Sequence, residues 1–90
     1  MSGANFQIDF IALGLDENLE KIELEEIENE VDHIRDLLVF DDDTNETIGL
    51  VSGGYTHNII GLILRGLAKK FGDNVAQAVV DGFELHDFGW

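Results

Sequence analysis

The chain has 90 residues, which is the length of one small domain with one core. Its 19 acidic and five basic residues give a formal net charge of −14, which argues against a surface that binds nucleic acid or an anionic membrane directly. The chain has no cysteine, so disulfide scaffolds, thiolate zinc sites and cysteine nucleophiles are excluded. We expect a single acidic domain over residues 1–90, with a flexible start at residues 1–5.

The first predicted element is a strand that begins at Phe6. Phe6, Ile8 and Phe10 alternate with polar residues, and this period of two is typical of a strand with one buried face. The segment 6–13 is therefore predicted to be a strand.

The second predicted element is a helix that ends near residue 38 and begins at about residue 18 or 23. Five apolar residues recur at the heptad spacing i, i+3, i+7, i+10 and i+14. This seam consists of Leu24, Ile27, Val31, Ile34 and Leu38. A seam of two heptads packs on the core of its own domain or, as an alternative, docks on a partner helix in an adaptor or a homodimer.

The second half of the chain predicts a hairpin followed by two helices. Residues 37–40 and 47–51 are β-prone runs around the polar turn 41–46. Thr56 is the expected N-cap of a helix that ends before Gly72. Asp73 is the expected cap of a short helix over 75–80, and residues 83–90 are predicted to be a last strand or an apolar tail.

These elements predict an α+β fold. We expect a small antiparallel sheet with two main helices packed on one face, in an order compatible with a split βαβ unit. The alternative is a mostly α-helical bundle.

The turn after Phe40 partly matches a calcium-binding loop. Asp41, Asp43 and Asn45 occupy positions 1, 3 and 5 of the EF-hand template. Positions 6 and 12, which require glycine and a bidentate glutamate, are Glu46 and Ser52. We therefore predict a solvated acidic turn, with a divalent-ion module at 41–52 as the alternative.

The residues that carry chemistry do not form a catalytic pattern. No two of His33, His57 and His86 have the i, i+4 spacing of a helical metal site. Ser52 is misplaced relative to a G-x-S-x-G nucleophile elbow. We expect a protein that is not an enzyme and that uses no cofactor or metal.

The most unusual feature is the density of carboxylates over residues 16–46, where fourteen acidic residues accompany two basic ones. Along a helix they recur every 5 to 6 Å, and like charges four residues apart destabilise the helix. The density of these carboxylates therefore lowers the stability of the predicted helix. The residues predicted to bind a partner are Glu23, Glu26, Glu28, Glu30, Asp32, Asp36, Asp41, Asp42 and Asp43.

The leading hypothesis is an inhibitor or binding protein that presents a phosphate-like array to a basic, nucleic-acid-binding site on a protein target. In size and charge the chain resembles phage-encoded anti-restriction and anti-CRISPR inhibitors and nuclease immunity proteins, although no motif matches any one family. Solvation is the competing interpretation of the acidity. Either a monomer or a homodimer is compatible with the sequence.

The sequence indicates neither export nor membrane insertion. Residues 1–5 lack the basic start of a signal peptide, and the longest apolar run, 59–64, is far shorter than the roughly 18 residues of a membrane span. With no cysteine, a cytoplasmic location is expected.

Overall fold

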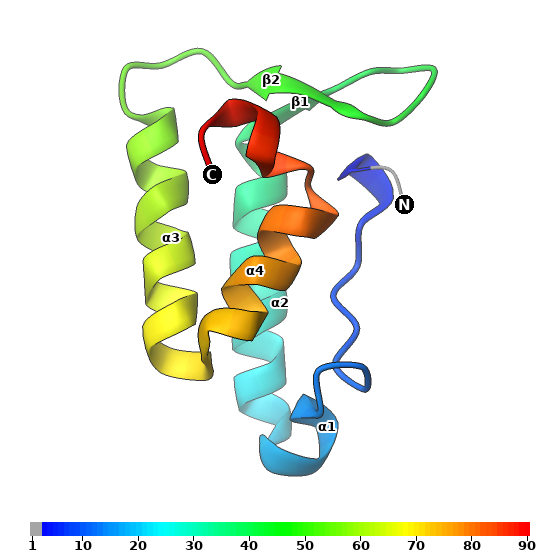
Figure 1. Cartoon of the computed structure of the whole chain (residues 1–90), viewed down its shortest axis with the longest axis vertical. Coiled ribbons are helices and arrows are strands. Elements are labelled where there is room, and N and C mark those ends of the chain that lie inside the picture. Colours follow the sequence, from blue (N-terminus) through cyan, green and yellow to red (C-terminus); the bar gives the residue numbers. More distant parts are fainter. Residues whose placement is uncertain (1–2) are drawn as a thin grey trace.

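The computed structural model describes residues 3–90 and has an α+β fold, as predicted. The predicted flexible start falls partly outside the described residues, since residues 1–2 are not among them. The elements are η1 (Gly3–Asn5), α1 (Leu15–Asn18), α2 (Lys21–Asp36), β1 (Leu38–Phe40), β2 (Thr47–Leu50), α3 (Thr56–Phe71), α4 (Asp73–Gly82) and η2 (Leu85–Phe88). The three longer helices are α2, α3 and α4, and β1 and β2 form a two-stranded hairpin. The hairpin lies across one end of the helices (Figure 1).

Helix α2 forms where the heptad seam predicts a helix. Ile27, Val31 and Ile34 of the seam are buried in the core, so the seam is not available as a docking face for another protein. This corrects the alternatives in which the seam docks on a partner helix in an adaptor or a homodimer, because a side chain already packed in its own core cannot also contact a partner. Leu38 is buried as well, but it begins β1, since the helix ends at Asp36.

The predicted hairpin is confirmed. β1 and β2 pair antiparallel, with Leu38 opposite Leu50 and Phe40 opposite Thr47. The inner face is buried, and there the Thr47 hydroxyl donates a hydrogen bond of 2.7 Å to the carbonyl oxygen of Phe83. The outer face, which includes Ile48, is exposed.

The strand predicted at Phe6 is wrong. Residues 6–9 are extended but pair with no strand, and residues 10–14 form turns in which the Leu15 amide donates to the Phe10 carbonyl. The period-two pattern correctly indicated one buried side, because Phe6 is buried and Ile8 and Phe10 pack on the core. This segment packs against helical side chains, so the backbone has no neighbouring strand to pair with.

The C-terminal strand and the split βαβ order are also wrong. Phe83 is fully buried, and Glu84 then adopts a left-handed conformation with φ 59°, which turns the chain into the 3₁₀-helix η2. In the described part of the chain the sheet has two strands that are consecutive in sequence, so it contains no crossover.

The two predicted C-terminal helices are confirmed as α3 and α4. Gly72, at φ 108°, separates them and allows the chain to reverse without a Cβ clash. Tyr55 and not Thr56 is the N-cap of α3, and Thr56 is instead a buried first residue of the helix. Asp73, the predicted cap of the next helix, is likewise the first residue of α4, and Gly72 is its N-cap.

Gly82, at the end of α4, packs closely on the ring of Phe6. A Cβ on Gly82 would lie 2.1 Å from the Phe6 ring, so Gly82→Ala forces the ring out of the core. We expect this overpacking to lower the free energy of unfolding by about 1–3 kcal/mol, which urea denaturation measures.

Gly61→Ala in α3 is the matched control. A Cβ there meets its nearest neighbour at 3.9 Å, an ordinary contact, and a helical Gly to Ala change stabilises by up to about 1 kcal/mol. Equal stability of the two variants would show that Phe6 does not pack on α4 as described.

Candidate functional site

The predicted partner-binding carboxylates occupy two sides of α2 and the hairpin turn. Glu28 and Asp32 border a hollow beside residues 7–10, and Ala4 of the same N-terminal segment donates its amide to the Asn45 carbonyl in the turn. Glu26 and Glu30 lie on the other side of α2, where they border α3. The structure therefore divides the predicted residues between a side near the N-terminal segment and a side near α3.

Four of the nine predicted carboxylates have structural contacts within the protein. Lys70 of α3 binds both oxygens of Glu26, at 2.6 and 2.8 Å, and so links α3 to α2. Arg35 pairs with Asp32 and also donates to the Phe6 carbonyl. The Glu23 carboxylate accepts the Glu20 amide at 3.1 Å, at the start of α2. The fourth is Asp41 in the turn.

The turn is held by the side chain of Asp41. Its Oδ1 accepts the backbone amides of Asp43 at 2.8 Å and Thr44 at 2.9 Å, and these bonds, the one from Thr44 first, lower the pKa of Asp41. The turn joins two strands, whereas an EF-hand loop joins two helices. Among residues 3–90, no three His, Cys, Asp or Glu side chains are grouped to hold a metal ion.

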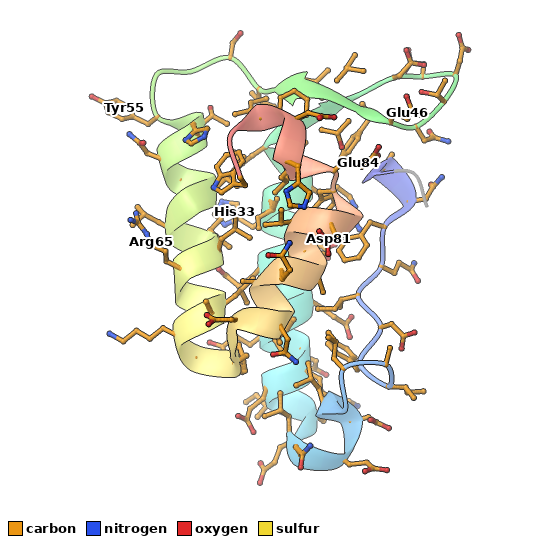
Figure 2. The ribbon with its side chains drawn as sticks, viewed as in Figure 1. His33, Glu46, Tyr55, Arg65, Asp81 and Glu84 are labelled. Atoms are coloured by element: carbon orange, nitrogen blue, oxygen red, sulfur yellow. The ribbon has the colours of Figure 1, made fainter. Side chains whose placement is uncertain are left out.

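The other five predicted carboxylates form no ion pair or side-chain hydrogen bond within residues 3–90. All of them except the half-buried Glu30 are exposed. They are Glu28, Glu30, Asp36, Asp42 and Asp43. We call Glu28, Asp36, Asp42 and Asp43 the free acidic group, and these four residues come from α2 and from the turn. Glu46 lies in the same turn, on the opposite side of the molecule from Tyr55 of α3 (Figure 2).

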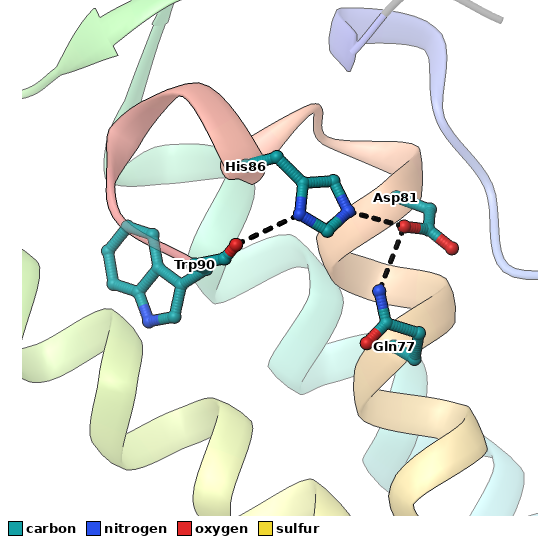
Figure 3. Close-up of polar contacts among 4 residues, drawn as sticks. All are labelled: Gln77, Asp81, His86 and Trp90. Atoms are coloured by element: carbon teal, nitrogen blue, oxygen red, sulfur yellow. Dashed lines mark hydrogen bonds and ion pairs between the residues drawn. The ribbon is translucent and has the colours of Figure 1, made fainter.

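Sequence reasoning missed a polar network around His86. His86 Nε2 lies 2.8 Å from Asp81 Oδ1, and His86 Nδ1 lies 2.9 Å from the Trp90 carbonyl oxygen (Figure 3). Gln77 donates a further bond of 2.9 Å to the same Asp81 oxygen. A carboxylate and a carbonyl are both acceptors, so both imidazole nitrogens donate only in the protonated ring.

The network shifts the pKa values of both partners. The hydrogen bond that His86 donates to Asp81 is the main cause that raises the pKa of His86, followed by the bond that it donates to the Trp90 carbonyl. The bond from His86, followed by that from Gln77, lowers the pKa of Asp81. The sequence gives no signal for this pair. Asp81 and His86 are five residues apart, and their contact depends on the left-handed turn at Glu84.

A second histidine holds the same C-terminal segment. The His57 ring of α3 stacks on the Trp90 indole with centroids 3.9 Å apart, and its Nε2 lies 3.2 Å from the Phe88 carbonyl oxygen. Trp90 borders one end of an open hollow of about 700 Å³ between α3 and α4. Small residues, Gly61 and Ala76, line it together with Arg65.

Comparisons with known proteins assign no function to the acidic residues of α2 and the turn. No protein-family model matches the chain, and neither the curated proteins nor the solved structures contain a match to it. In the part of the chain that the structure describes, no helix has the length and apolar character needed to cross a membrane.

The pH dependence of the His86–Asp81 pair is testable. The pKa of His86 is raised, so its stabilising contribution is complete below the ordinary value of 6.5 and is lost as the pH rises through the folded-state pKa. The pKa of Asp81 is lowered, so its contribution is present above the ordinary 3.8 and is lost as the pH falls through the folded-state pKa. We expect the pair to stabilise the fold most between pH 3.8 and 6.5.

Thermal unfolding of the native protein and of His86→Gln across pH 4–8 measures this contribution. The Tm difference between the two is expected to shrink above the folded-state pKa of His86. His33→Gln, which changes an exposed histidine of α2, is the control. A Tm difference that stays constant with pH would contradict an ion pair.

Proposed function

We propose that this protein is a non-enzymatic, cytoplasmic binding protein that docks its free acidic group on a basic, nucleic-acid-binding site of a protein target. The observation that supports this most directly is that these carboxylates are exposed and form no side-chain hydrogen bond or ion pair within residues 3–90. They therefore do not hold the fold together through ion pairs, and their carboxylates are accessible to cationic side chains of a partner.

The energetics of α2 support a role outside folding. Glu28, Asp32 and Asp36 follow one another at i+4, where like charges destabilise a helix by a few tenths of a kcal/mol per pair. Arg35 offsets only part of this through Asp32. A surface that costs stability yet does no structural work is typical of a functional site.

The expected partner follows from the charge. A net charge of −14 repels nucleic acids and anionic membranes but steers the protein towards a basic cleft, which raises the association rate at low salt. Proteins that bind DNA or RNA present such clefts to phosphates. The proposed mode of action is therefore competitive: carboxylates occupy the positions of phosphates and exclude the nucleic acid.

The test is a double charge reversal in the free acidic group, Glu28→Lys with Asp36→Lys. The tagged protein is used to capture partners from a lysate of the cells that make it, and bound proteins are released with salt or short duplex DNA and identified by mass spectrometry. We expect the native protein to retain a nucleic-acid-binding protein that the duplex displaces. The reversed variant should retain it at least roughly tenfold less, because a tenfold loss needs only about 1.4 kcal/mol and opposed like charges cost several kcal/mol.

The matched control is Asp73→Lys with Asp87→Lys, which makes the same change in net charge at exposed residues of α4 and η2. Circular dichroism should show that both variants fold, since exposed substitutions usually change stability by less than about 0.5 kcal/mol. Equal loss of capture in both variants would mean that only net charge matters. No captured nucleic-acid-binding protein would overturn the proposal.

A further inference from the structure

Helix α3 carries an exposed stripe that faces away from the core. Tyr55, Ile59 and Leu62 are spaced i, i+4 and i+7, and they are 75%, 37% and 61% exposed. Gly66 continues the line one turn further and is exposed as well. In Figure 2, Tyr55 and Arg65 both point outwards from α3. We call Tyr55, Ile59, Leu62 and Gly66 the α3 stripe.

The stripe ends at a hollow that suits an aromatic ring with a hydroxyl group. The hollow holds about 220 Å³ between α2 and α3, and its wall includes Glu26, Glu30, Gly66, Leu67 and Lys70. Gly66 leaves open space where a Cβ would be. Leu67 offers an apolar floor, and Glu30, which forms no ion pair within residues 3–90, offers an acceptor for a phenol.

The protruding Tyr55 and the hollow stand at opposite ends of the same stripe. If two copies pair their α3 helices antiparallel, about a twofold axis between residues 60 and 61, each Tyr55 meets the Gly66 hollow of the other copy. The same rotation places each Ile59 against the other copy's Leu62. All four residues of the stripe are used in one self-complementary contact, as an isologous interface requires.

We propose that the α3 stripe is the interface of an antiparallel homodimer in which the Tyr55 side chain of each copy fills the Gly66 hollow of the other. This inference does not depend on the proposed function, since the free acidic group contains no residue of the stripe.

The charges of α3 favour a second copy as the occupant. Two chains of net charge −14 repel each other, and α3 carries Arg65, Lys69 and Lys70 with no acidic residue, so repulsion is smallest there. The N-cap Tyr55 makes no side-chain cap hydrogen bond, which leaves the positive end of the helix dipole free. In the antiparallel pair this end faces Glu26 and Glu30 of the other copy.

Sedimentation velocity over a range of protein and salt concentrations tests the dimer. We expect a dimer that salt strengthens, because salt screens the repulsion between the two acidic chains. Tyr55→Ala should raise the dimer Kd roughly tenfold or more, as expected for an aromatic anchor that fills a pocket on its partner. Leu62→Glu should leave a monomer.

The controls change exposed apolar residues outside the stripe. Ile11→Ala matches Tyr55→Ala, and Ile48→Glu matches Leu62→Glu; Ile11 is 77% and Ile48 57% exposed. Neither control should change the dimer Kd by more than about twofold, since scattered surface contacts contribute little.

Cysteine cross-linking tests the register, because the native chain has no cysteine. A mixture of Tyr55→Cys and Gly66→Cys should form a disulfide between copies, and that heterodimer keeps one intact Tyr55–Gly66 contact. Each variant alone should not, because its two cysteines lie about 16 Å apart along the helices, beyond disulfide reach.

Three results would overturn the inference. The first is a protein that stays monomeric under all conditions. If Leu62→Glu also abolishes capture of a target, the stripe is the binding site of that target. The second is a dimer that resists both Tyr55→Ala and Leu62→Glu. The third is cross-linking of either single variant as efficient as that of the mixture.

Discussion

The fold depends on the burial of Phe83, where four segments of the chain meet. Its ring packs edge to face on Phe6 at 5.0 Å and lies 6.5 Å from Phe40 of β1. The Arg35 guanidinium of α2 lies 5.4 Å from the ring centroid, and the Phe83 carbonyl accepts the Thr47 hydroxyl of β2. One residue thus joins the N-terminal segment, α2, the hairpin and the end of α4. A chain of 90 residues has few such junctions, so this contact also fixes where the acidic turn stands.

The elements that the sequence predicted well are those whose signal is local. The heptad spacing of Ile27, Val31 and Ile34 indicated α2, and Gly72 marked the end of α3. The two wrong strands share a different cause. Both contain alternating apolar residues, which report that one side of the segment is buried but not what covers it. Phe6 and Phe83 cover each other, so neither segment needs a strand beside it.

The candidate surface was predictable in composition but not in arrangement. The count of carboxylates identified the region, whereas only the tertiary contacts of Lys70 and Arg35 separate paired carboxylates from free ones. The His86 network was beyond prediction for a similar reason. His86 reaches Asp81 because Glu84 adopts a left-handed conformation, and His57 reaches Trp90 across 33 residues of sequence.

Ion pairs neutralise two carboxylates of α2. Of the five basic residues, Lys21 and Arg35 lie on α2 itself, and Arg65, Lys69 and Lys70 lie on α3. Arg35 and Lys70 each pair with one carboxylate while joining α2 to another segment. Helix α2 therefore keeps its self-repulsion and depends on the burial of Ile27, Val31 and Ile34 to remain folded. Hydrophobic packing that tolerates a repulsive outer face holds the helix backbone that carries these carboxylates in place, and under the proposed function such a preorganised array binds a basic partner at a lower entropic cost than a flexible acidic tail.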